Sequence, residues 1–474
     1  MKKDKNIVIK KIISYTRYWL ESIALNKLIF FHLWWLLLFI IPTTAQEQNL
    51  EEKVNKLEKQ VETLINEVTN LHEIIQTQQK VIEQNAKKIV HPKTLPYEEI
   101  IKELEEDLSY NKDQTYYLNV LNSHLQIGGY SELIFIAEEK KDPQFIFSRF
   151  ALRVRSSIQD WLSFQAEIAI EDDIDLEISY AHFNILLSPI FNIKAGLIIV
   201  PFGQYNSFYP PPGNELTSIP LVNEFLIPTV WSEPGVSVYG QIDNFSPLTL
   251  TYEFLISNGL GEGGFDIVEG NRDARQDFNV DNNADKQFSG RIGFIPHLSL
   301  LPFGFVFGLS GVIGEFDDNG NNQYAGLAVD GNLRIGSFSL IGDHNYIEIS
   351  GEYAQFDIES DDRIVQLFPQ IASFMSGHYI QVDYFFFPEQ WRGQSFLFND
   401  QSQFALSLRY DHLQFDSSQK GASELDDQSI YTIGINFRPV EKAVFKVEYN
   451  HIRKFVNGSE DWIGRLQASF STYF

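Results

Sequence analysis

The sequence predicts an all-β transmembrane barrel of about 16 antiparallel strands, preceded by an N-terminal α-helical coiled coil. Apolar and polar residues alternate along many C-terminal segments, and aromatic residues make up 14% of the chain, with 39 Phe and 21 Tyr. Mean hydropathy is nevertheless −0.17. In a bilayer-spanning barrel only every second residue meets lipid, so such a chain is rich in aromatics yet polar on average. A soluble β-sandwich or β-propeller is the alternative with this composition.

Residues 1–45 have the pattern of an export signal. A lysine-rich region precedes the apolar run Leu28–Ile41, and small residues follow up to Ala45, where cleavage before Gln46 is expected. The run is shorter than the roughly 20 residues that a membrane-spanning helix needs. A signal peptide is therefore predicted, with a retained anchor as the alternative, and the protein is expected to leave the cytoplasm.

Residues 46–85 predict a periplasmic coiled coil, because apolar residues recur every three or four positions over several heptads. This stripe is expected to mediate oligomerisation through Val54, Leu57, Val61, Leu64, Val68, Leu71 and Ile75. A single amphipathic helix packed on its own domain is the alternative. Pro92 and Pro96 then interrupt the pattern, so 86–123 is interpreted as a linker.

From about residue 124 to 474 the period changes to two residues, which is typical of strands. Sixteen strand segments are predicted: 124–136, 145–158, 161–171, 175–187, 190–200, 235–243, 247–257, 285–296, 303–315, 322–337, 345–357, 377–387, 402–415, 428–438, 442–454 and 462–474. Eighteen strands remain an alternative count. Alternation alone does not distinguish a soluble sheet from a barrel in lipid, but the export signal and the strand lengths favour lipid. The terminal Phe474 resembles the signal that the barrel-assembly machinery recognises in bacterial outer-membrane barrels.

Several of these segments, in their order along the chain, resemble the phosphate-selective porin O/P family, including relatives with N-terminal periplasmic coils. The segments are Ala195–Gly203 (AGLIIVPFG), Gly290–Pro296 (GRIGFIP), Gly351–Ala354 (GEYA), Gly377–Tyr384 (GHYIQVDY), Leu408–Tyr410 (LRY), Gly434–Pro439 (GINFRP) and Arg465–Gln467 (RLQ). The resemblance implies a homotrimeric pore in a Gram-negative outer membrane, in contact with lipid and lipopolysaccharide. It also implies that the third extracellular loop, here 201–234, folds inward and narrows the channel.

This loop differs from phosphate-selective members because it contains no Lys or Arg. It carries Glu215, Glu224 and Glu233 together with Trp231, which are expected to form the constriction. Pore width and the sign of the lining charge set selectivity, so the pore is expected to favour cations or neutral solutes over phosphate. The alternative is that these glutamates lie on an outward loop.

The pore lumen is expected to contain Arg149, Arg153 and Arg155, which alternate with apolar residues on one predicted strand. Glu167 on the next strand lies roughly opposite Arg153. These charges could create a transverse field across the pore. The alternative is that they pair locally and satisfy a polar wall.

The composition argues against several other functions. There is no Cys, which excludes a thiolate metal site and a lipoprotein anchor, and the formal charge of −26 argues against nucleic-acid binding. The acidic loop Asp317–Asn322 offers oxygen ligands but lacks the spacing of a helix–loop–helix calcium site. No catalytic motif, metal site or cofactor is expected. The predicted function is passive diffusion of small hydrophilic solutes; a ligand-specific, siderophore-type uptake channel and a structural outer-membrane tether are the alternatives.

Overall fold

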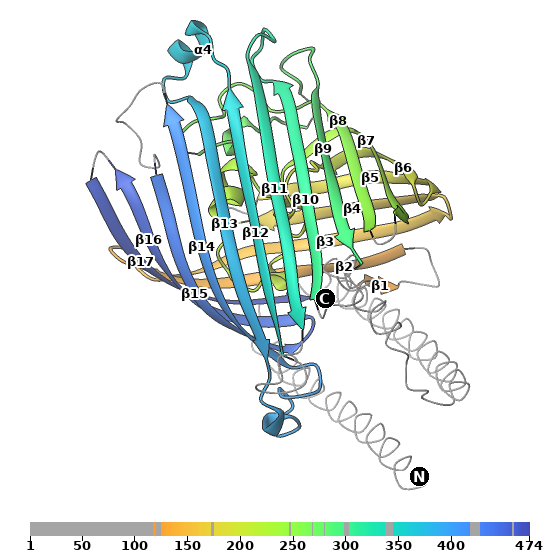
Figure 1. Cartoon of the computed structure of the whole chain (residues 1–474), viewed down its shortest axis with the longest axis vertical. Coiled ribbons are helices and arrows are strands. Elements are labelled where there is room, and N and C mark those ends of the chain that lie inside the picture. The colour runs from red at the N-terminus through yellow and green to blue at the C-terminus, as the bar shows by residue number, and fades with distance from the viewer. Residues whose placement is uncertain are drawn as a thin grey trace, which may run out of the picture. The chain divides into compact units, whose positions relative to one another are not determined.

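A computed structural model describes residues 117–119, 125–171, 175–245, 248–267, 269–278, 280–297, 303–336, 345–417, 427–456 and 459–474 (Figure 1). The predicted signal peptide, the coiled coil with its oligomerisation stripe, and most of the linker lie outside the described residues. They therefore remain predictions. Among the described residues no helix is long and apolar enough to cross a membrane.

Sixteen strands, β2 to β17, form one closed antiparallel barrel. Each strand pairs with its neighbour in sequence, and β17 pairs with β2 to close the sheet. The short strand β1 Tyr117–Asn119 pairs with β2 Leu125–Glu138 beyond the end of β17. The others are β3 Gln144–Gln159, β4 Leu162–Glu171, β5 Asp175–Ser188, β6 Phe191–Ile199, β7 Ser232–Phe245, β8 Leu248–Ser257, β9 Gln287–Pro296, β10 Phe303–Glu315, β11 Gln323–Gly336, β12 Tyr346–Ile358, β13 Ala372–Phe386, β14 Gln403–Ser417, β15 Asp427–Val440, β16 Ala443–Val456 and β17 Ser459–Tyr473. The predicted barrel with sixteen strands is confirmed, and the count of eighteen is not.

The wall of the barrel is apolar outside and polar inside. On β15 the side chains of Tyr431 and Ile433 are 50% and 51% exposed, whereas Thr432 and Asn436 are buried. The same alternation holds on β16, where Val447 is exposed and Glu448 is buried. A soluble barrel or sandwich would bury its apolar face instead. This arrangement matches outer-membrane barrels, in which the outer face meets acyl chains.

The two rims of the barrel differ in their connections. One rim, here called the turn rim, has short connections such as 160–161 and 441–442 and includes Phe474. The other, the loop rim, carries the long connections 200–231, 258–286 and 359–371 (Figure 1). Phe474 pairs through its backbone with Gly129 and stacks on Phe150 at 5.6 Å between ring centroids. One turn-rim connection, 387–402, is unusually long.

The loop-rim connections pack on one another around Phe265. The ring centroids of Phe316 and Tyr324 lie 5.0 and 5.1 Å from that of Phe265. The helix α4 Asp362–Leu367 contributes Arg363, which donates to Asp317 at 2.8 Å. Burial opposes ionisation of Asp317, but backbone N–H groups of Asn322 and Asn321, with Arg363, donate to its oxygens and hold the pKa of its carboxyl below the usual value. These loops thus form a packed cap on the loop rim, which is stabilised by the hydrogen bonds that Asp317 accepts.

Candidate functional site

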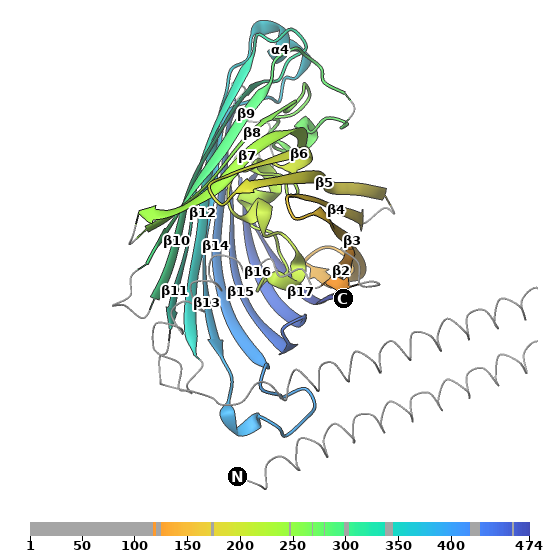
Figure 2. The same cartoon turned by 90° about the vertical axis from the view of Figure 1, so that its right-hand side faces the viewer.

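A segment after β6 crosses the interior of the barrel. This inward segment, 201–231, contains the short helices η2 Tyr205–Ser207, η3 Pro211–Gly213 and η4 Val222–Leu226. Figure 2 shows it between the wall formed by β12 to β16 and the wall formed by β3 to β5. It ends three residues earlier than predicted, because β7 already begins at Ser232.

Wall carboxylates accept hydrogen bonds from the backbone of the inward segment. Glu352 on β12 accepts from the N–H groups of Gln204 and Tyr205 at 2.7 and 3.0 Å. Glu448 on β16 accepts from the N–H groups of Thr217 and Ser218 at 2.6 and 3.0 Å. An irregular segment inside a barrel has many unpaired N–H groups, and leaving one buried without a partner costs about 1–3 kcal/mol. The wall acids therefore hold the segment in place.

Wall cations bind the carbonyl groups of the same segment. Arg409 donates to the carbonyl of Ser218 at 2.7 Å, and Arg438 donates to that of Pro212 at 2.6 Å. Lys446 donates to the carbonyl of Pro211 at 2.8 Å. The segment itself has no Lys or Arg, and the cations that stabilise it are supplied by β14 to β16.

On the opposite side the segment contacts a buried charge cluster on β3 and β4. The hydroxyl of Tyr209 donates to Glu167 at 2.7 Å, and Tyr130 donates to the same carboxylate at 3.0 Å. Arg153 pairs with Glu167, its direct register partner, and its guanidinium lies over the Tyr130 ring at 5.1 Å. Arg149 lies over the Tyr209 ring at 5.2 Å. The inward segment is thereby fixed to two opposite walls of the barrel.

The structure does not bring the three predicted constriction glutamates together. Glu215 is buried, with its oxygens bound by Arg438 at 2.9 Å and Asn436 at 2.8 Å. Glu233 belongs to β7 and accepts from the indole N–H of Trp231, which is itself fully buried. Glu224 lies on η4, where burial raises the pKa of its carboxyl.

The structure also brings only some of the predicted lumen residues together. Arg149, Arg153 and Glu167 form the interior cluster, as local pairing on β3 and β4 would predict. Arg155 is exposed and is not part of this cluster. Its register partner is Gln165, so no acid lies opposite it on β4.

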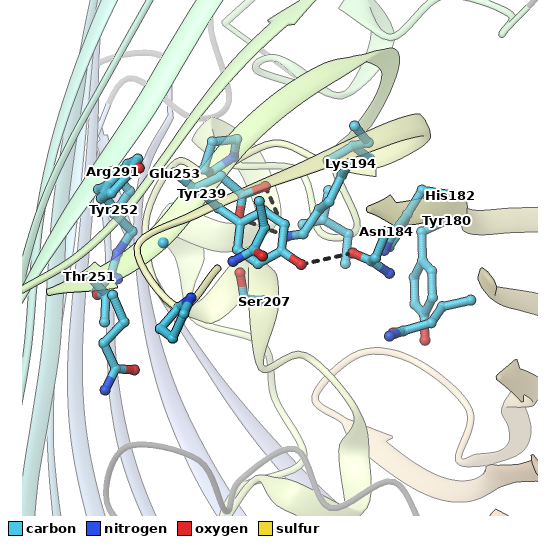
Figure 3. A pocket seen from close by; sticks show the side chains of 18 of the residues that line it. Tyr180, His182, Asn184, Lys194, Ser207, Tyr239, Thr251, Tyr252, Glu253 and Arg291 are labelled. Carbon is cyan, nitrogen blue, oxygen red and sulfur yellow. Dashed lines mark hydrogen bonds and ion pairs between the residues drawn. The ribbon is translucent and has the colours of Figure 1, made fainter. Parts of the chain in front are cut away.

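A cavity of about 590 Å³ lies beside the inward segment, between it and the wall from β4 to β9. Figure 3 shows Lys194, Glu253 and Tyr239 facing one another there. Lys194 contacts both oxygens of Glu253 at 2.8 and 2.9 Å and lies over the Tyr239 ring at 4.6 Å. Arg291, the register partner of Glu253, donates to Asp330 at 3.0 Å. The cavity wall therefore carries charges of both signs, each with a partner.

These cavity residues were not predicted from the sequence. Lys194, Glu253 and Arg291 occupy polar positions of β6, β8 and β9, but their alignment depends on the register between strands. That register becomes visible only when the pairs Lys194–Ser237 and Glu253–Arg291 are known. In the sequence, only their alternation with apolar residues indicated that these side chains face the interior of the barrel.

The described part of the chain contains no group of three or more His, Asp or Glu side chains placed to hold a metal ion. In the acidic loop 317–322, both oxygens of Asp317 accept hydrogen bonds from the protein itself. That loop is thus stabilised by its own amides and by Arg363.

No known family profile matches this chain. An uncharacterized protein of Aquifex aeolicus is 26% identical over 350 residues, which cover 69% of this chain and 75% of the relative. Similar solved structures include OprB of Pseudomonas putida at high pH, with a TM-score of 0.49, 9% identity and coverage of 73% of this chain and 93% of that one. The outer-membrane channel DcaP of Acinetobacter baumannii has a TM-score of 0.45, 10% identity and coverage of 74% and 97%. Membership of the phosphate-selective porin O/P family is not confirmed by these similarities.

Proposed function

We propose that the chain is an outer-membrane porin that lets small hydrophilic solutes diffuse passively past the inward segment. One observation carries this proposal: beside the segment, a cavity lined in part by charged side chains remains inside a barrel whose outer face is apolar. The turn rim faces the periplasm, since short turns occur there in bacterial barrels.

We propose that the passage has little charge preference and admits neutral solutes alongside ions. Lys194 and Glu253 are equally exposed, at 21% each, and neutralise one another. Glu215 is neutralised by Arg438, so the carboxylates of the inward segment give less cation preference than their number suggests. With no cation on the segment, nothing in it would concentrate phosphate.

The proposal is tested by single-channel conductance of the full-length protein in planar bilayers. Ser207 is exposed on the inward segment and lines the cavity. Ser207→Trp should lower conductance by about half or more, because conduction depends on pore width. Asn319→Trp, at an exposed position of the loop rim, is the matched control and should conduct as the native protein does.

The outcome also separates the other functions. Open-channel current that falls only in Ser207→Trp supports a diffusion pore. Current blocked at low concentration by one solute would identify a ligand-specific channel instead. A folded barrel without current would make the structural tether the better account.

A trimer held by the coil at 46–85 is proposed as the assembly. Its support is the length of the apolar stripe in the sequence. Removing 46–85 and measuring the mass of the detergent-solubilised barrel tests it. A complex that contains the same number of chains with and without 46–85 would show that the coil does not determine assembly.

A further inference from the structure

The long turn-rim connection 387–402 folds back against the outer face of the barrel. Phe404 on β14 and Phe437 on β15 lie on the outward side of their strands, the side on which Leu406 and Ile435 are exposed. The ring of Trp391 lies 6.1 Å from that of Phe404, and the ring of Phe398 lies 5.6 Å from that of Phe437. The connection, here called the aromatic hook, therefore covers part of the apolar wall. Figure 1 shows it beyond the lower ends of β13 and β14.

Several polar groups of the hook are paired within the hook itself. Arg392 pairs with Glu389 at 2.8 Å, lies over the Phe387 ring, and donates to the carbonyls of Asn399 and Asp400 at 3.0 Å. The N–H of Gly393 donates to the carbonyl of Phe398 at 2.6 Å. Backbone that enters the hydrocarbon region of a bilayer must be paired internally, because no water is present there. These bonds meet part of this requirement.

The hook also exposes large apolar side chains. Phe396 is 88% exposed, the highest value among the large hydrophobic residues that the structure describes, and Trp391 and Leu397 are partly exposed. Glu389 and Gln394 on the same hook are exposed as well. Aromatic and polar side chains mixed in one element are typical of the membrane–water interface.

We propose that the aromatic hook is a lipid-binding element that inserts Phe396 and Trp391 into the periplasmic leaflet of the outer membrane. Continuity with the lipid-facing wall argues for lipid as the occupant. The hook packs on the same outward rings that begin the apolar belt of β13 to β15. Anchoring would fix the depth and tilt of this side of the barrel. It also explains why this turn is long while the next turn along the rim, 441–442, has two residues.

Because the chain has no cysteine, single cysteines can be labelled with a fluorophore in the full-length protein in liposomes. The three sites are Phe396→Cys, the lipid-facing control Leu408→Cys on β14, and the water-facing control Asn319→Cys. Lipids that carry a nitroxide near the head group should quench the label at position 396 severalfold more than the label at position 319. Phe396 makes no ring contact with the rest of the hook in the structure, so its replacement leaves the aromatic cluster intact.

Aqueous iodide provides the second measurement. Equal quenching of the labels at positions 396 and 319 by iodide, with little by lipid nitroxide, would place the hook in water and overturn the proposal. Protection of position 396 from both quenchers would mean that a second copy of the chain or another protein covers it, which also overturns the proposal. Conductance equal to that of the native protein confirms that each variant has folded.

Discussion

Replacing Glu448 by Gln tests whether wall carboxylates hold the inward segment. In the native protein the two oxygens of Glu448 accept from Thr217, Ser218 and the side chain of Asn450. A glutamine keeps the shape but has only one acceptor oxygen. If that oxygen stays with Ser218 and Asn450, the amide nitrogen faces the backbone N–H of Thr217, which cannot turn away.

The cost follows from this geometry. One buried N–H loses its partner, at about 1–3 kcal/mol, and a charge-assisted bond to Ser218 becomes a weaker neutral one. A total of about 2 kcal/mol corresponds to roughly 30-fold more frequent local opening of the segment. Hydrogen–deuterium exchange of the amides of Thr217 and Ser218 measures that opening directly.

Glu441→Gln is the matched control, since Glu441 is exposed on the turn between β15 and β16 and its replacement removes the same charge. We expect native exchange at Thr217 and Ser218 in this variant. Native exchange in Glu448→Gln as well would refute the view that the wall acids hold the segment. Faster exchange in both variants would point to a general charge effect.

Three further predictions concern other parts of the barrel. Glu253→Gln should shift the reversal potential in a salt gradient towards anions more than Glu215→Gln does, because Glu253 lines the cavity; equal shifts would contradict the assigned passage. Asp317 has a folded pKa below its unfolded value, so its contribution to the loop cap is present above about pH 4 and is lost as pH falls through the folded pKa. Protease resistance of 258–286 should therefore drop in acid in the native protein and already be reduced at pH 7 in Asp317→Asn; an identical pH profile in both would exclude this role. Phe474→Ser should lower the amount of barrel assembled in cells, measured by heat-modifiable mobility, and native amounts would show that the terminal ring is not a signal.

Most of the barrel could be predicted from the sequence because strand alternation is a local property. Each of the sixteen predicted segments overlaps one observed strand. The predicted strand boundaries were wrong where alternation is weak. Strand β13 begins at Ala372, five residues before the predicted start, and its first pairing with β14 is irregular. There the neighbouring strand, rather than the sequence pattern, decides the structure.

The candidate site could be predicted only in part, because its contacts are long-range. Glu167 and Arg153 lie on adjacent strands joined by a tight turn, so their pairing follows from local register. Glu215 gave no such indication, since its partner Arg438 is 223 residues away in sequence. A carboxylate without a visible partner was interpreted as a pore charge, and the structure instead pairs it with the wall.

The absence of Lys and Arg from the inward segment follows from how it is held. A cation on the segment would face the barrel wall, where Arg409, Arg438 and Lys446 already occupy its carbonyl groups. Like charges at such distances would repel in the low dielectric of a packed interior. The wall can therefore hold the segment with both signs of charge because the segment itself carries no cation. Selectivity must then come from the cavity wall that the segment leaves uncovered.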